Sequence, residues 1–117
     1  QLVEADQQAA AIRYRATVLR AWHEVDDALE TMRAERARYA AAQQGVEQSR
    51  IAVRVAERRY RSGATGYNDV LIAERAELER EVEWADARAA HAVAVTSLYK
   101  ALGGGWVPPT AAARMSS

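Results

Sequence analysis

Apolar residues recur every seven positions along the first half of the chain. They form a column of Val18, Val25, Met32, Tyr39, Val46, Val53 and Tyr60. A seven-residue repeat of this length is typical of helices that pack side by side in a left-handed coiled coil. The first half contains no proline, and Gly45 alone costs only about 1 kcal/mol relative to alanine. We therefore expect one long helix over residues 1–61.

A second column with the same period predicts a second helix over residues 67–102. Its expected interface residues are Leu71, Leu78, Ala85, Ala92 and Tyr99, with Val82, Val95, Leu98 and Leu102 beside them. The stretch from Glu74 to Arg88 is rich in acids and is expected to be a solvent-exposed face. The two segments together predict an all-α fold, a long antiparallel helical hairpin with coiled-coil-like packing.

The interface of this hairpin is expected to be thin. The companion column on the first helix begins with Trp22 and Leu29 and then turns polar at Arg36, Gln43, Arg50 and Glu57. Alanines at 34, 37, 40, 41, 52 and 56 are expected to fill the neighbouring positions. Such an interface lets helices approach closely but buries little apolar area per residue.

Residues 62–66, with the sequence Ser-Gly-Ala-Thr-Gly, predict the turn between the helices. Gly63 suits the left-handed cap at the end of the first helix. Thr65 and Asn68 are alternative N-caps for the second helix. Residues 103–117 are expected to end the second helix at the Gly103-Gly104-Gly105 run and then to form a disordered tail.

The first helix is longer than the second, so its most apolar part lacks a partner in this hairpin. Val18, Leu19 and Trp22 belong to this surplus, which must be buried by another chain or by a missing part of the same protein. We expect the chain to self-associate through the region of Val18, Trp22 and Val25. The chain opens in helical sequence without Met, so we expect it to be a piece of a longer protein.

Composition excludes several classes of function. With 16 basic and 16 acidic residues the formal net charge is zero, so no bulk charge favours a nucleic-acid partner. The chain has no cysteine for a disulfide or a thiolate metal site. His23 and His91 fall on different helices, and abundant acids on a charged helix are usually solvated. The sequence therefore argues against an enzyme and predicts neither a metal nor a cofactor.

The turn is flanked by Tyr60 and Tyr67, which a simple helical turn does not need. The two rings either hold the end of the hairpin together or form a contact point for another protein, or a constriction where several hairpins converge. The pattern alone leaves these alternatives open.

Three blocks of sequence resemble the TolC-like outer-membrane efflux proteins of the OprM/NodT lipoprotein group. They are YRATVLRAWHEVDDAL at 14–29, RYRSGATGYNDVLIAE at 59–74 and LYKALGGGW at 98–106. The resemblance implies a hairpin of the periplasmic α-barrel of a homotrimeric channel in a Gram-negative outer membrane. Such a channel exports drugs and toxic compounds passively, in a tripartite pump with a periplasmic adaptor protein and an inner-membrane pump.

The resemblance also implies roles for residues at the turn. Tyr60 matches a tyrosine that helps to close some family tunnels, and Asp69 matches an acid that forms a carboxylate ring near the entrance. The residues that match the adaptor contact are Ser62, Gly63, Ala64 and Thr65. Two positions depart from the pattern, because Thr65 replaces an arginine of TolC and Ile72 replaces a second acid that is common in the family.

A second interpretation is a soluble dimeric coiled-coil scaffold with a protein-binding turn. The surplus around Trp22 discriminates between the two. A scaffold buries Trp22 by self-pairing alone, whereas a channel needs segments that this chain lacks.

Overall fold

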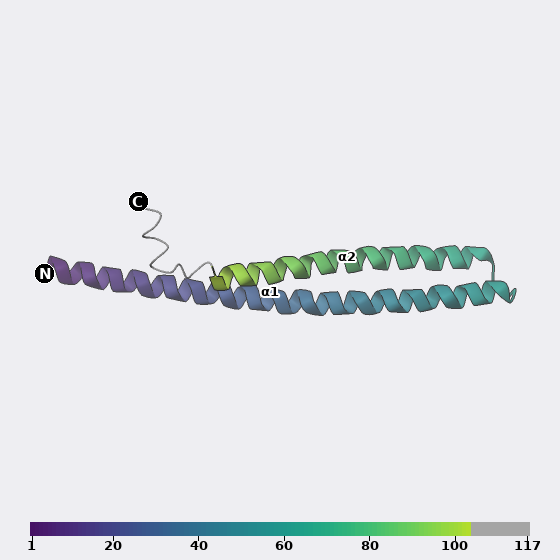
Figure 1. Cartoon of the computed structure of the whole chain (residues 1–117), viewed down its shortest axis with the longest axis horizontal. Helices are drawn as coiled ribbons and strands as arrows, with labels where there is room; N and C mark the ends of the chain where they lie inside the picture. Colours follow the sequence, from purple (N-terminus) through teal and green to yellow (C-terminus); the bar gives the residue numbers. More distant parts are fainter. Residues whose placement is uncertain (104–117) are drawn as a thin grey trace. The chain divides into compact units, whose positions relative to one another are not determined.

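The computed structural model describes residues 1–103, which form two helices joined by a short turn. Helix α1 spans Leu2–Arg61 and helix α2 spans Tyr67–Gly103 (Figure 1). The described part contains no strand, so the predicted all-α fold is confirmed. The expected disordered tail and the last three residues of the block LYKALGGGW lie outside the described residues.

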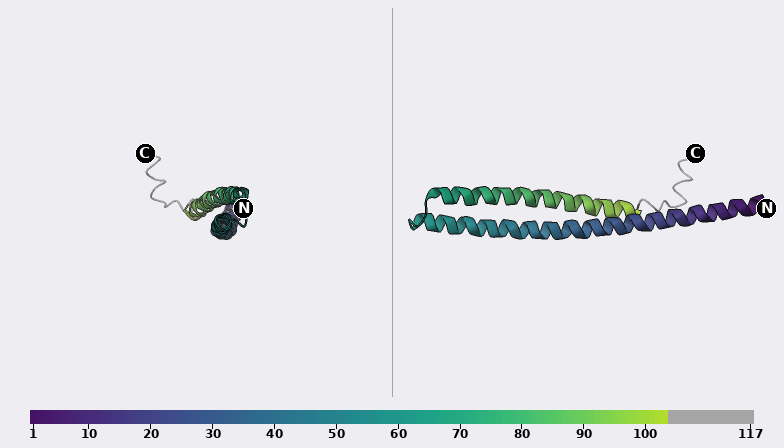
Figure 2. Two further views of the ribbon diagram at one scale, coloured as in Figure 1. Left: turned by 90° about the vertical axis from the view of Figure 1, so that its right-hand side faces the viewer. Right: turned by 180° about the vertical axis from the view of Figure 1, so that it is seen from behind.

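The chain divides into two compact units, one of which is Arg33–Val93. In this unit the end of α1 and the start of α2 run antiparallel on either side of the turn, and the views in Figures 1 and 2 agree on this. The hairpin is held by side chains of both helices that meet along its length.

Close packing in the hairpin depends on large side chains that meet small residues. Tyr39 stacks on Trp84 and on His91, with ring centroids 6.4 Å and 5.8 Å apart. Ala87 lies one turn from each of these two residues and is 0% exposed, so the Tyr39 ring covers it. Gly45 provides a second small position, since a Cβ there would lie 3.6 Å from Cδ of Arg80.

The fully buried side chains are few and small. In the unit 33–93 they are Val46, Val53, Val70 and Ala87. Val46 and Val53 belong to the predicted column of α1, which therefore faces α2. The predicted companions are mostly exposed: Arg36, Gln43 and Ala34, Ala37, Ala40, Ala41 and Ala52 all face solvent. The predicted Ala56 is half-buried, and Ala42 and Ser49, which were not predicted, are half-buried on the same side of the column.

The predicted interface column of α2 is wrong by one residue. Leu71 is 47% exposed, Leu78 62% and Tyr99 71%. The residues that face α1 lie one position earlier: Val70, Glu77, Trp84 and His91 are buried or half-buried. A shift of one residue rotates a helical position by about 100°, so the apolar column of α2 points away from α1. The stretch from Glu74 to Arg88 consequently contributes to the interface and is not wholly solvated.

The second unit combines residues 1–32 with the end of α2 from Ala94. Ala94 is 4% exposed, and Val25, Ala28, Met32 and Leu98 are half-buried around it. Towards the start of α1 the apolar side chains lose this cover. Trp22 is 65% exposed and Leu19 59%, so the expected apolar surplus is confirmed.

The turn is a Schellman motif that ends α1. The N–H of Gly63 donates to the carbonyl of Tyr60 at 3.0 Å, and the N–H of Ala64 donates to the carbonyl of Arg59 at 2.9 Å. Gly63 has a φ of 76°, as predicted for the left-handed cap. These bonds satisfy two of the carbonyls that every helix leaves free at its C-terminus.

Neither predicted N-cap begins α2. Gly66 precedes its first residue, and the backbone N–H of Asp69 donates to the Gly66 carbonyl at 3.3 Å. Asn68 lies within the first turn of the helix. The Thr65 hydroxyl is buried and has no hydrogen-bond partner, so it caps nothing.

Substitution of Ala87 tests whether the interface depends on small residues. Ala87→Leu is expected to lower the free energy of unfolding by about 1–3 kcal/mol, because no space remains beneath Tyr39. Ala85→Leu is the matched control, since Ala85 is exposed on the same helix and its change is expected within about 0.5 kcal/mol. Urea unfolding followed by circular dichroism measures both. Equal losses in the two variants would contradict the packing described.

Substitution of two glycines by alanine is expected to change the stability of the chain in opposite directions. Gly63→Ala forces a side chain into the left-handed region and is expected to destabilise the chain by about 1–2 kcal/mol. Gly45→Ala lies inside α1 at ordinary contact distance from Arg80, so it is expected to stabilise by up to about 1 kcal/mol. Thermal unfolding of both variants checks the signs, and a loss at Gly45 would show that the helices approach too closely for a Cβ.

Candidate functional site

The turn presents three of the four predicted adaptor-contact residues to solvent. Ser62, Gly63 and Ala64 are exposed, whereas Thr65 is half-buried. The Ser62 hydroxyl donates to the carbonyl of Arg59 at 3.0 Å, which fixes it against the end of α1. A partner that reaches the turn therefore meets backbone and small side chains, with a buried hydroxyl of Thr65 behind them.

Tyr60 and Tyr67 pack edge to face across the turn. Their ring centroids are 5.2 Å apart and the ring planes meet at 62°. Each side chain remains about half exposed, at 47% and 51%. With Val70, they line a groove whose other residues are Glu57, Arg61 and Glu74. The pair thus holds the helix ends together and still offers aromatic surface to a partner.

Asp69 lies in a different groove from the tyrosines. It is exposed in the first turn of α2, where the partial positive charge of the helix N-terminus favours a carboxylate. Its groove is lined by Ala52, Val55, Ala56, Arg59 and Thr65. The resemblance places Tyr60 and Asp69 at one tunnel entrance, and the turn brings both to the same end of the hairpin. It does not bring them into one groove.

The two helices of the hairpin have opposite charge. Residues 33–61 of α1 include eight arginines and three glutamates, a net charge of +5. Residues 67–93 of α2 include seven acids and three arginines, a net charge of −4 with His91 neutral. Three of the recorded ion pairs join residues of one helix: Arg38–Glu35, Arg75–Glu79 and Arg80–Glu83. Most of this charge is therefore displayed at the surface.

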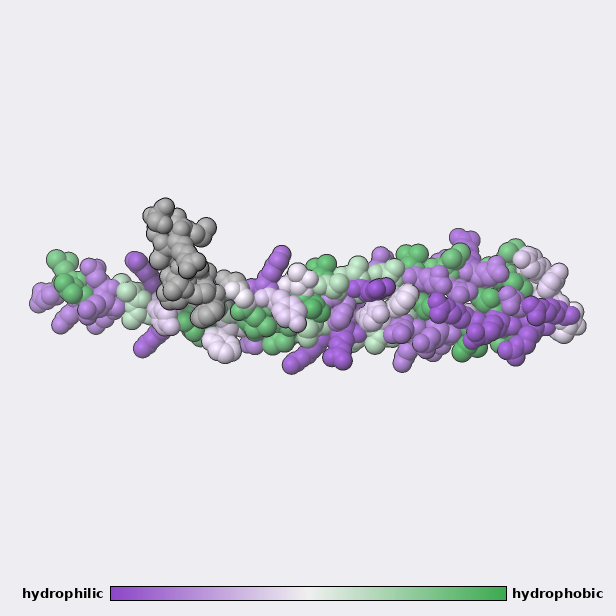
Figure 3. Space-filling model, viewed as in Figure 1, coloured by the Kyte–Doolittle hydropathy of each residue, from purple (hydrophilic) through white to green (hydrophobic). Residues whose placement is uncertain are grey.

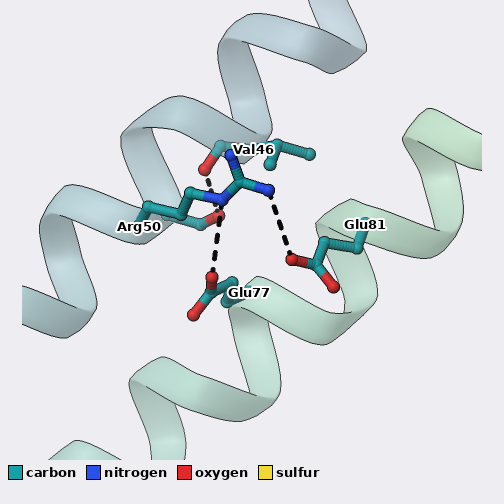
Figure 4. A network of polar contacts seen from close by, with 5 residues as sticks. Val46, Arg50, Glu77 and Glu81 are labelled. Atoms are coloured by element: carbon teal, nitrogen blue, oxygen red, sulfur yellow. Dashed lines mark hydrogen bonds and ion pairs between the residues drawn. The ribbon is translucent and has the colours of Figure 1, made fainter.

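One arginine joins the two helices by ion pairs. Nε of Arg50 lies 3.7 Å from a carboxylate oxygen of Glu77, and a terminal guanidinium nitrogen lies 3.6 Å from Glu81 (Figure 4). These three residues are called the Arg50 cluster below. Sequence reasoning missed it because it assigned Arg50 to a polar companion column and the acids to a solvated face. The available signal was the spacing of Glu77 and Glu81, which puts both on one face of α2.

Exposed apolar residues occur on the outer surfaces of both helices. On α1 they include Ile51 at 52% exposure and Val55 at 40%, and on α2 Ile72 and Val82, both at 61%. Figure 3 shows hydrophobic patches among hydrophilic side chains on one face of the molecule. Together with Leu71 and Leu78 these exposed residues provide more apolar surface than a two-helix hairpin can cover.

Residues 1–103 contain no group of three or more histidine, cysteine or acidic side chains arranged to hold a metal ion. Neither helix, over the same residues, is apolar enough for long enough to cross a membrane.

Comparison with known proteins identifies the family. The family model described as "Outer membrane efflux protein" matches residues 1–104. No solved structure matches the chain significantly.

Several curated relatives align over most of the chain. The pyoverdine export outer membrane protein OpmQ of Pseudomonas putida is 40% identical over 106 residues, which cover 91% of this chain and 23% of OpmQ. The outer membrane protein OprJ of Pseudomonas aeruginosa is 32% identical, over 90% of this chain and 22% of its own length. The cation efflux system protein CusC of Escherichia coli is 33% identical, over 90% of this chain and 23% of its own length.

The chain spans less than a quarter of the length of these relatives. Within that span, the family match includes the whole of both helices and the turn between them. The resemblance seen in the three sequence blocks is thus confirmed: the chain belongs to the outer membrane efflux protein family.

Proposed function

We propose that this hairpin is a periplasmic segment of a homotrimeric tunnel that exports small molecules across the outer membrane. Members of the family are outer membrane proteins, and their helical segment lies in the periplasm. The observation that supports a tunnel is the apolar surface left uncovered on both helices, which is suited to neighbouring helices on each side. In a closed ring of hairpins these surfaces become interfaces and the remaining polar faces line or surround the lumen.

The export itself is passive in this proposal. The energy comes from an inner-membrane pump and reaches the tunnel through a periplasmic adaptor protein. Ser62, Gly63, Ala64 and Thr65 are proposed to contact the adaptor, because small residues at the turn let a partner backbone approach closely. The relatives are named for different cargo, pyoverdine for one and cations for another, so we assign a substrate class of small molecules and toxic compounds.

Deletion of the full-length gene from its own bacterium tests the proposal. The deletion strain is expected to accumulate a fluorescent efflux dye and to become more sensitive to toxic compounds, and the intact gene is expected to restore both. Chemical crosslinking of the membrane-embedded protein is expected to yield trimers. A soluble dimer whose loss leaves dye accumulation unchanged would instead establish the scaffold interpretation.

Asp69 is proposed to form a ring of three carboxylates near the tunnel entrance, with Tyr60 in a separate gating role. Such a ring concentrates cations because three like charges add at one height of the lumen. In the full-length channel in a lipid bilayer, Asp69→Asn is expected to weaken block by divalent cations severalfold. Asp86→Asn, another exposed acid of α2, is the matched control and is expected to leave the block unchanged. An equal weakening of the block in both variants would contradict the proposed position of Asp69 at the tunnel entrance.

The 117-residue chain by itself is proposed to self-associate through Val18, Trp22 and Val25. Val18 is 36% exposed, and it lines an apolar groove with Tyr14, Arg15 and Leu19. Burial of such side chains is worth about 2 kcal/mol each, so Trp22→Ser is expected to weaken association by about tenfold or more. Sedimentation equilibrium measures the association constant of each variant. Ile72→Ser is the control, because Ile72 has a similar exposure and lies in the other unit. Equal weakening by both variants would point to nonspecific association.

A further inference from the structure

The Arg50 cluster links the two helices at a point where the rest of their interface is made of small residues. Arg50 is half exposed, and its guanidinium reaches two acids one turn apart on α2 (Figure 4). Among residues 1–103, these are the recorded ion pairs that cross from α1 to α2; the other three stay within one helix.

The Glu77 carboxylate needs the Arg50 guanidinium as an ion-pair partner because Glu77 lies on a partly buried face of α2. It occupies the face of α2 that meets α1, in the column of Val70 and Trp84, and its side chain is 24% exposed. The register of the hairpin places it opposite Ser49. The Ser49 hydroxyl donates to the carbonyl of Val46 at 2.7 Å, so its proton is already committed within α1. Arg50 therefore supplies the positive charge that a partly buried carboxylate on this face requires.

We propose that Arg50 is a positioning residue that sets the axial alignment of α1 against α2. A charged or polar group at an interface position is known to select one register of a coiled coil, because alternative registers leave it without its partner. Moving α2 by seven residues in one direction would bring Arg50 opposite Trp84 and Arg88. Moving it in the other direction would bring Arg50 opposite Val70 and Glu74. Both shifts lose at least one of the two ion pairs, and the first adds a like charge.

The small residues of the interface do not supply this selection. Alanines recur along both helices, at Ala42 and Ala56 on α1 and at Ala73 and Ala87 on α2, so a displaced helix meets similar surface. The Schellman turn fixes the alignment where the helices join, but Arg50 lies eleven residues before the end of α1. Sliding of the helices at this level breaks at least one of the two ion pairs. The inference concerns alignment within this chain and does not rest on the proposed export function.

Spin-label distances in the 117-residue chain test the proposal. The chain has no cysteine, so Gln48→Cys and Ala89→Cys introduce two unique labelling sites, both exposed and on opposite helices. The two sites lie at different heights, so a slip of seven residues changes their separation by up to about 10 Å. The unaltered cluster is expected to give one narrow distance distribution in pulsed electron paramagnetic resonance.

Removal of the charges is expected to broaden that distribution or to add a second, displaced distance. Arg50→Gln and the double variant Glu77→Gln with Glu81→Gln remove opposite halves of the cluster, and the same change is expected from both. Arg75→Gln is the matched control, because it removes an ion pair to Glu79 that stays within α2. Circular dichroism checks that each variant keeps its helical content.

Reversal of the charges separates alignment from general stability. Arg50→Glu combined with Glu77→Arg and Glu81→Arg restores attraction in the native alignment and is expected to restore the narrow distribution. A distance distribution that stays narrow in the Arg50→Gln variant overturns the proposal. A distribution that broadens equally in Arg75→Gln, or that stays broad in the helical charge-reversed chain, overturns it as well.

Discussion

The rest of the hairpin depends on the fit of large side chains over small ones. Tyr39 covers Ala87 and the stem of Arg80 passes over Gly45, so α1 and α2 approach closely without a thick layer of apolar residues between them. Such an interface removes little apolar area from water, because alanine and glycine contribute almost none of their own. Its few buried side chains must therefore be helped by aromatic stacking and by charge at the edges.

A thin interface also explains why so much apolar surface faces outward. The apolar column of α2, with Leu71 and Leu78, points away from α1 although its spacing is as regular as that of a buried column. An isolated hairpin gains nothing from this arrangement. A helix that packs against neighbours on two sides needs it, which agrees with membership of a family of outer membrane efflux proteins.

The turn concentrates chemistry at one end of the hairpin but divides it between two grooves. The aromatic pair Tyr60 and Tyr67 lines one, and Asp69 lines the other with Arg59. The roles proposed for Tyr60 and for Asp69 therefore belong to separate grooves of this chain. A change at the aromatic pair alters how the helix ends are held, whereas a change at Asp69 alters the charge of an exposed carboxylate and leaves the Schellman bonds in place.

Features that arise within one helix or one turn could be predicted from the sequence. The long helix of α1, its column through Val46 and Val53, the family and the left-handed Gly63 all follow from local patterns, because each depends on residues close together in the chain. Three other features depend on how the helices pack. They are the column of α2 that faces α1, the ion pairs of Arg50 with Glu77 and Glu81, and the separation of Tyr60 and Asp69 into different grooves. Adjacent columns of α2 are both plausible interfaces by pattern, and they differ by a rotation of about 100°. That rotation is set by contacts between residues far apart in sequence, which no local pattern records.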